Sequence, residues 1–296
     1  MGSSVKVSSF FKVKFTFPLI VAAVALLFLA LPGQALAQVD PDCNAENGDG
    51  TFDNDQLDGA GNACVRTPDF YGIQMFEMYV CRSAPTPPTT TAAIVLTGCD
   101  IILSSTSGEL IEVKLGQSTT IPGTATRPSP GVYTHGYILM GNGFRIRHSQ
   151  QMESVTSAED PSTTGTFCWT LTKSLATGSV GNASKCRNTA PTAAEIGTTT
   201  DVLENFGAVG TYIFTAAPIT AHIIKASGFL LATGEETQAV RLVGIQTFAT
   251  PVEVTEKSRS LDMAFNVSTG MTVSFNNTDD LEAFASGPFS VLMTVE

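Results

Sequence analysis

Residues 70–105 read FYGIQMFEMYVCRSAPTPPTTTAAIVLTGCDIILSS, two apolar runs on either side of a loop rich in proline and threonine. The first run, Tyr71 to Cys81, is apolar on both alternating faces, which is typical of a strand covered on both sides. The second run, Ala92 to Ser104, has the same pattern. A helix is the alternative, but the β-branched and aromatic residues favour strands. The segment predicts two neighbouring strands inside a β-domain.

The loop between these runs contains Pro85–Pro88 and three threonines. Proline can neither continue a helix nor donate regularly to a sheet, so we expect a stiff, exposed loop. If Cys81 bonds Cys99, the two strands are antiparallel and Glu77 lies near Leu103.

The first 37 residues have the pattern of a secretory signal. Lys6, Lys12 and Lys14 precede an apolar run from Phe15 to Leu31, and Ala35-Leu36-Ala37 provides a small-residue cleavage site. We expect cleavage after Ala37, with a retained membrane anchor as the alternative. The chain is then secreted, to the extracellular space or cell surface, with periplasmic transit if the source is a Gram-negative bacterium.

The exported chain is strongly acidic. Removing residues 1–37 takes away three lysines and no acid, which changes the net charge from −11 to −14. We therefore do not expect the exported chain to bind nucleic acid or anionic membranes. No later segment is apolar and long enough to span a bilayer.

All six cysteines follow the signal, and an exported chain with six cysteines indicates a disulfide framework. Fifteen connectivities are possible. Pairing of sequence neighbours gives loops of similar size, and no zinc-ligand spacing competes with it. The predicted bonds are Cys43–Cys64, Cys81–Cys99 and Cys168–Cys186.

Residues 38–66 form an acidic segment rich in Asp, Asn and Gly with little to bury. Oxygen ligands alternate with glycines there, an arrangement by which calcium loops bring carboxylates together. The predicted calcium ligands are Asn47, Asp49, Asp53 and Asp55. The match to an EF-hand is poor, and a solvated acidic loop closed by a disulfide is the alternative.

The remaining residues, 67–296, predict one β-sandwich domain with a possible subdivision near 187–197. Gly141-Asn142-Gly143 predicts a tight hairpin. Two short helices are expected at 201–206 and 279–285, because each begins with Asp followed by Glu and ends at a glycine. About a dozen strands without a βαβ rhythm predict an all-β, antiparallel sandwich of jelly-roll type.

Isolated polar residues give little indication of chemistry. Arg145 and Arg147 share one strand face, and with His135 they make the only local basic cluster. That cluster is either a solvent face or an anion site, and it could meet the acidic segment of the same or a neighbouring molecule. His148 and His222 have no second ligand at metal spacing.

Larger catalytic patterns are missing as well. The sequence contains no nucleophile elbow, P-loop or dinucleotide fingerprint. Trp169 is expected in the core rather than in a sugar site, because apolar residues flank it. We therefore expect no enzyme, although a pair of carboxylates for glycoside hydrolysis leaves no sequence signature.

These patterns favour an exported structural subunit that acts by self-association, in an oligomer or filament. A secreted module that binds glycan or protein through the proline loop is the alternative, and a secreted hydrolase is the third. The alternating strand 289–295 follows Gly287-Pro288, so we expect it to take part in association, by closing its own sandwich or by exchange with a neighbour.

Overall fold

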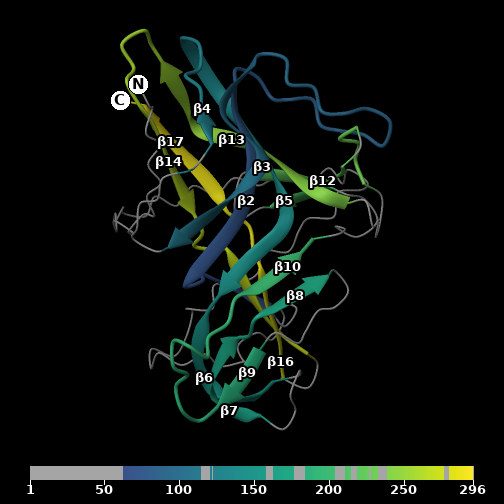
Figure 1. Ribbon diagram of the computed structural model, residues 1–296, viewed down its shortest axis with the longest axis vertical. Coiled ribbons are helices and arrows are strands. Elements are labelled where there is room, and N and C mark those ends of the chain that lie inside the picture. The colour runs from purple at the N-terminus through teal and green to yellow at the C-terminus, as the bar shows by residue number, and fades with distance from the viewer. Residues whose placement is uncertain are drawn as a thin grey trace, which may run out of the picture.

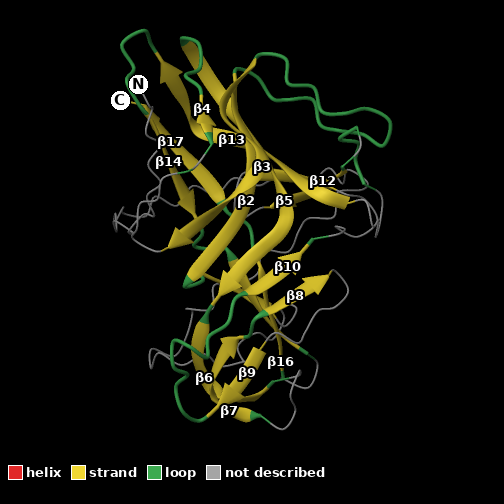
Figure 2. Ribbon diagram, in the orientation of Figure 1, coloured by secondary structure: helices red, strands yellow, loops and turns green. Residues whose placement is uncertain are grey.

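The computed structural model describes an all-β protein, and no helix occurs among the residues that it describes (Figure 2). These residues are 63–114, 121, 123–157, 163–176, 184–203, 211–214, 219–226, 228–232, 239–276 and 280–295. None of them forms a helix that could cross a membrane.

The strands follow one another in chain order as β1 (Ala63–Arg66), β2 (Phe70–Cys81), β3 (Cys99–Lys114), β4 (Thr124–Ala125), β5 (Gly131–Arg147), β6 (Ser149–Thr156), β7 (Thr164–Thr170), β8 (Lys173–Ala176), β9 (Ser184–Arg187), β10 (Thr199–Val202), β11 (Thr211–Phe214), β12 (Ile219–Lys225), β13 (Ala239–Val254), β14 (Leu261–Asn266), β15 (Met271–Phe275), β16 (Leu281–Ser286) and β17 (Ser290–Val295).

Nine strands make one large sheet in the order β11-β12-β13-β5-β2-β3-β4, with β10 beside β5 and β8 beside β10. All pairs are antiparallel except β8 with β10. β2 lies in the middle and is buried on both faces, which confirms the interpretation of its apolar pattern. Figure 1 shows most of this sheet in the upper part of the molecule, β10 and β8 below it, and β6, β7 and β9 at the lower end.

β2 pairs with β3 as the cysteines predicted, with Cys81 opposite Cys99. Glu77 lies opposite Ser104, and Met78 lies opposite Leu103. The residue opposite Glu77 is thus displaced by one from the expected Leu103, because the ladder shifts register between Met78 and Tyr79.

The hairpin predicted at Gly141-Asn142-Gly143 is wrong, because β5 runs straight through these residues. β5 changes partner here: Gly141 lies opposite Arg241 of β13, and Gly143 lies opposite Val202 of β10. The Asn142 side-chain amide donates to the carbonyls of Leu203 and Ala239, both at 2.9 Å. Asn142 thus joins the end of β10 to the start of β13.

A long bent hairpin supplies the opposing layer. Its ladder runs from Leu261–Val295 to Asn266–Ser290 in β14 and β17, and from Met271–Ser286 to Phe275–Leu281 in β15 and β16. At the bend, the Gly287 N–H donates to the Gly270 carbonyl at 2.9 Å. The Tyr71 hydroxyl donates to the Gly287 carbonyl at 2.9 Å, which fixes the bend to β2.

Neither predicted helix is present in the described part of the chain, where 201–202 and 281–285 lie in strands instead. Residues 199–202 form β10, and residues 204–210 lie outside the described part. The Asp201 carboxylate does not cap a helix; it accepts hydrogen bonds from the Ser286 N–H at 2.7 Å and hydroxyl at 2.6 Å. Residues 281–286 pair with β15, and this ladder overrides the local capping pattern.

The lower part contains β6, β7 and β9 in one sheet, closed by the disulfide between Cys168 and Cys186. Trp169 is 2% exposed, so its prediction as a core residue is confirmed. The Arg187 guanidinium lies 5.0 Å from its ring centroid.

Two apolar clusters cover the two faces of the large sheet. The major cluster joins the inner face, with Ile138 and Met140, to Phe265 and Phe289 of the bent hairpin region. The minor cluster lies on the opposite side, which we call the outer face. It consists of Phe76, Cys81, Tyr137, Leu139, Ile224, Val243 and Ile245.

Candidate functional site: the arm and the cavity beneath it

The loop between β2 and β3 forms an arm, residues 82–98, that extends beside the large sheet toward β12 (Figure 1). Its base is closed by the Cys81–Cys99 disulfide. Next to that bond, the guanidinium of Arg82, the first residue of the arm, lies 3.5 Å from the carboxylate of Asp100, which follows Cys99. The base of the arm is therefore fixed twice, by a covalent bond and by an ion pair.

Asp100 also ties the base to the strand beneath it. Its carboxylate accepts hydrogen bonds from the Tyr133 hydroxyl at 2.5 Å and from the Ser129 N–H at 2.9 Å. Partial burial acts to raise the pKa of Asp100, but these bonds and the charge of Arg82 hold it below its ordinary value. Burial and the Asp100 carboxylate raise the pKa of Tyr133 to about 12.

Further hydrogen bonds hold the arm along its length. Thr86 and Val95 exchange backbone hydrogen bonds of 3.1 Å in each direction. At the tip, the Thr89 N–H donates to the Ala92 carbonyl at 2.8 Å. The Leu231 N–H donates to the Thr89 carbonyl at 2.9 Å, which attaches the tip to the segment after β12. The expected stiff loop is thus held at base, middle and tip.

The returning half of the arm packs on the outer face. Ile94 and Leu96 are partly buried against the minor apolar cluster, which includes Tyr137 and Ile245. The arm therefore covers part of the outer face with Ile94 and Leu96. The side of the arm that does not contact the sheet is exposed to solvent.

Beside the arm lies an open cavity of about 370 Å³. It is bounded by the arm on one side and by β5, β11, β12 and β13 on the other. Its lining residues are Ala84, Pro85, Pro87, His135, Ile213, Ile219, Thr220, His222, Ile245 and Thr247. The cavity combines an apolar wall with two imidazoles and two threonine hydroxyls.

Both histidines are held toward the neutral form. Burial lowers the pKa of His222 to about 4 and lowers the pKa of His135 less strongly. His222 pairs with Val243, which pairs with Leu139, four residues from His135 along β5. That separation is roughly 13 Å along the strand and roughly 10 Å across it. The two imidazoles are too far apart to share a metal ion.

The arm surface carries no charge although the protein is acidic. No residue from Ser83 to Gly98 is charged, and most of this stretch is exposed. Val95 is 49% exposed, Ile213 of β11 is 56% exposed and Phe229 is 43% exposed. We call residues 83–98, which include Val95, together with Phe229 the arm surface. Depletion of charge and exposed apolar groups are typical of a surface that binds another molecule.

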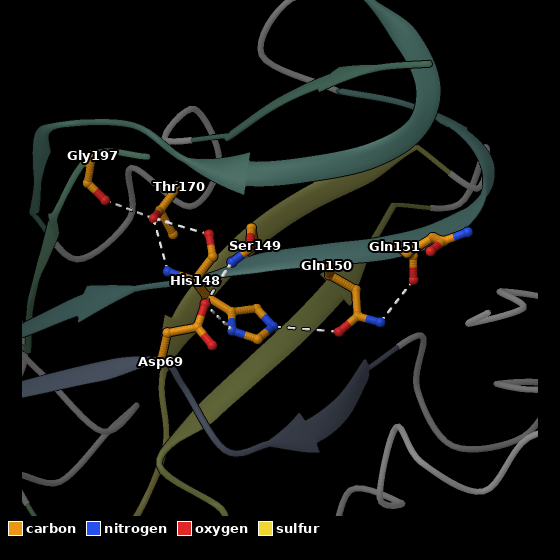
Figure 3. A network of polar contacts seen from close by, with 7 residues as sticks. All are labelled: Asp69, His148, Ser149, Gln150, Gln151, Thr170 and Gly197. Atoms are coloured by element: carbon orange, nitrogen blue, oxygen red, sulfur yellow. Dashed lines mark hydrogen bonds and ion pairs between the residues drawn. The ribbon is translucent and has the colours of Figure 1, made fainter. Parts of the chain in front are cut away.

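A second polar centre surrounds His148 (Figure 3). The imidazole Nδ1 lies 3.3 Å from the Asp69 carboxylate, and Nε2 lies 3.3 Å from the Gln150 side-chain oxygen. Burial acts to raise the pKa of Asp69, but the contact with His148 and the N–H of Ser149 hold it below its ordinary value.

This centre has the geometry of a structural junction. Thr170 accepts from the His148 N–H at 3.0 Å and lies 2.7 Å from the Gly197 carbonyl. His148 is 4% exposed, and an edge contact with Phe284 covers its ring. Both imidazole nitrogens face side chains of the network, and none of the partners in Figure 3 is a serine or cysteine side chain aimed at them. The arrangement joins the start of β2 to β6 and β7.

The predicted site residues have different outcomes. The bonds Cys81–Cys99 and Cys168–Cys186 are confirmed. Cys43, and with it the predicted bond to Cys64, lies outside the described residues, as do the predicted calcium ligands Asn47, Asp49, Asp53 and Asp55. In the described part of the chain, no group of three or more His, Cys, Asp and Glu side chains could hold a metal ion.

The basic cluster is divided by the structure. Arg145 and Arg147 are exposed on one face of β5, as predicted, whereas Phe144 and Ile146 point inward. His135 lies near the other end of β5, in the cavity. Sequence reasoning missed Asp69 and the cavity, since both combine segments that are far apart in the chain.

Comparison with known proteins adds no relative: no family model matches the chain, and no curated protein or solved structure is similar to it.

Proposed function

We propose that the protein is an exported, non-enzymatic β-sandwich subunit that acts outside the cell by association through its arm surface. One observation carries this proposal: an arm fixed at base, middle and tip exposes an uncharged surface on a protein of net charge −11. Association between acidic copies requires a contact region free of like charges.

The compartment agrees with this role. The two disulfides indicate an oxidising environment such as the extracellular space. An export signal in residues 1–37 provides a route to that environment.

The polar centre at His148 favours association over hydrolysis. A hydrolase of the triad type needs a nucleophile within hydrogen-bond reach of the imidazole. The Nε2 of His148 instead faces the side-chain oxygen of Gln150 at 3.3 Å. The pair Asp69–His148 therefore supports a structural role.

A secreted binding module is the second candidate, and the cavity favours it. A volume of about 370 Å³ with an apolar wall and a few polar groups suits part of a small ligand or one side chain of a protein partner. Under this alternative, the chain itself stays monomeric and the arm surface binds a different molecule.

The test is sedimentation velocity of the exported chain over a concentration series. We expect reversible association that strengthens with salt, since salt screens repulsion between acidic copies. The double variant Val95→Lys with Phe229→Lys should weaken association at least tenfold. The matched control is Val132→Lys with Leu292→Lys, because Val132 and Leu292 are similarly exposed, at 51% and 46%, outside the arm surface.

A monomer at every concentration would overturn self-association. If that monomer also bound an immobilised glycan or protein, and the arm variant lost this binding while the control retained it, the binding-module alternative would replace the proposal.

A further inference from the structure

In the part of the chain that the structure describes, the large sheet ends differently at its two edges. At one edge, β4 has two residues, which pair with Leu103 and Ser104. Arg127 and Pro128 follow it, and the Arg127 guanidinium donates to the carbonyl of Thr255 at 2.7 Å. A very short strand with a charge and a proline beside it is a protected edge.

The other edge has none of these features. Among the described strands, β11 pairs only with β12, from Thr211 opposite His222 to Phe214 opposite Ile219. The sequence of β11, Thr-Tyr-Ile-Phe, contains no charge and no proline, and its residue types favour strands. Such a strand is a template for pairing with another chain.

Ile213 connects this edge to the arm surface. Across the sheet, Ile213 lies opposite Thr220, which lies opposite Ile245, which lies opposite Tyr137. These residues share the outer face, because directly opposed residues of neighbouring strands point to the same side. Ile213 is 56% exposed and lines the cavity beside Pro85. The edge and the arm therefore form one continuous uncharged region.

We propose that two copies of the chain join through β11, strand against strand and antiparallel, so that the large sheet continues from one copy into the other. This inference rests on the proposed function and names the partner as a second copy. A two-fold axis perpendicular to the sheet sets each residue of β11 against the same strand of its partner. Residues 205–224 contain no Asp, Glu, Lys or Arg, so this symmetric contact brings no like charges together.

The two arms then lie on the same side of the joined sheet, one on each side of the seam. A four-residue strand pair alone buries less than the roughly 1,600 Å² of a standard interface. The exposed arm surface next to the seam supplies further contact area.

β17 is a poorer strand for this role. It is already paired along its length with β14, from Val295 opposite Leu261 to Ser290 opposite Asn266. The carbonyl of Gly287, just before β17, accepts a hydrogen bond from the Tyr71 hydroxyl. Exchange of β17 with a neighbouring copy would break its ladder with β14, whereas pairing between two β11 strands adds a ladder without breaking one.

Two measurements on the exported chain test this inference. In sedimentation velocity, Ile213→Lys should weaken association at least tenfold, because two added charges meet across the seam. Val132→Lys, at a site of similar exposure, should change it less than twofold. Fluorescence of the buried Trp169 reports that each variant is folded.

Hydrogen exchange of the unmodified chain gives a readout specific for strand pairing. The amides of 211–214 that point away from β12 should become protected as concentration rises, while those of 124–125 should not change. If the chain associates but these amides stay unprotected and Ile213→Lys associates normally, this inference is wrong and association through the arm stands. If the chain never associates, the proposed function fails with it.

Discussion

The side-chain amide of Gln246 forms the two hydrogen bonds that a neighbouring strand would give to the backbone of Val291. Its Nε2 donates to the Val291 carbonyl at 2.7 Å, and its Oε1 accepts from the Val291 N–H at 2.8 Å. Both residues are buried. Gln246 lies on β13 and Val291 on β17, so one side chain joins the bent hairpin to the large sheet where no backbone ladder does.

Replacing Gln246 with Leu should therefore destabilise the fold. The change leaves a buried N–H and a buried carbonyl of Val291 without partners, at about 1–3 kcal/mol each. We expect the free energy of unfolding in urea to fall by at least about 2 kcal/mol. Thr247→Val, at the exposed neighbouring position, is the control and should stay within about 0.5 kcal/mol. Equal effects of the two changes would contradict this role of Gln246.

Two glycines should respond differently to replacement with alanine. A Cβ at Gly287 would overlap the backbone oxygen of Thr269, which cannot move without opening the bend. A Cβ at Gly141 would lie 2.9 Å from Oε1 of Gln74, the end of a flexible side chain that can turn away. We expect Gly287→Ala to cost about 3 kcal/mol or more and Gly141→Ala about 1 kcal/mol or less. Thermal unfolding of the two variants measures both losses of stability. A larger loss for Gly141→Ala than for Gly287→Ala would contradict this prediction.

Stability should depend on pH through His222. Burial lowers its pKa to about 4, whereas the unfolded chain titrates near 6.5. Between these values only the unfolded chain binds the proton, so stability should fall as pH decreases from 6.5 to 4, by at most about 3 kcal/mol. His222→Gln should remove most of this slope and leave the weaker contribution of His135, whose pKa is also lowered by burial. The contribution of Asp69 to stability falls in a separate pH range, because its pKa is lowered and this contribution is lost only as pH falls below 3.8.

The two confirmed disulfides offer a matched comparison. Each joins cysteines 18 positions apart, so the chain-entropy model gives each about 3 kcal/mol of stability. We expect similar destabilisation from Cys81→Ala with Cys99→Ala and from Cys168→Ala with Cys186→Ala. Only the first pair should also weaken association in sedimentation, because it frees the base of the arm. Equal loss of association in both would argue against the arm surface.

Local patterns predict β2 closely, and Cys81 and Cys99 set its register with β3. The second predicted strand, Ala92 to Ser104, is correct only from Cys99, because residues 92–98 belong to the arm and β3 continues to Lys114. These features depend only on residues within one segment. The residues of the proline-threonine loop likewise predict its exposure, and most of them are exposed.

The errors occurred where a distant segment decides the structure. Gly141-Asn142-Gly143 has the local pattern of a turn, but Leu203 and Ala239 hold Asn142 in an extended strand. Asp201 has the pattern of a helix cap, but its carboxylate is used by Ser286. The sequence does not predict the cavity for the same reason. Its lining residues come from the arm, from β5 and from the group β11 to β13, which lie far apart in the chain.

The order of the strands along the chain determines when the protein can finish folding. Every strand of the large sheet ends by Val254, and the hairpin that covers its inner face begins only at Leu261. Until residues 261–295 have been synthesised, side chains such as Ile138 and Met140 have no covering layer. A nascent chain at that stage exposes apolar surface and is prone to aggregate. If the protein is exported as we propose, crossing the membrane before folding would keep this apolar surface from being exposed in the compartment where the chain is made.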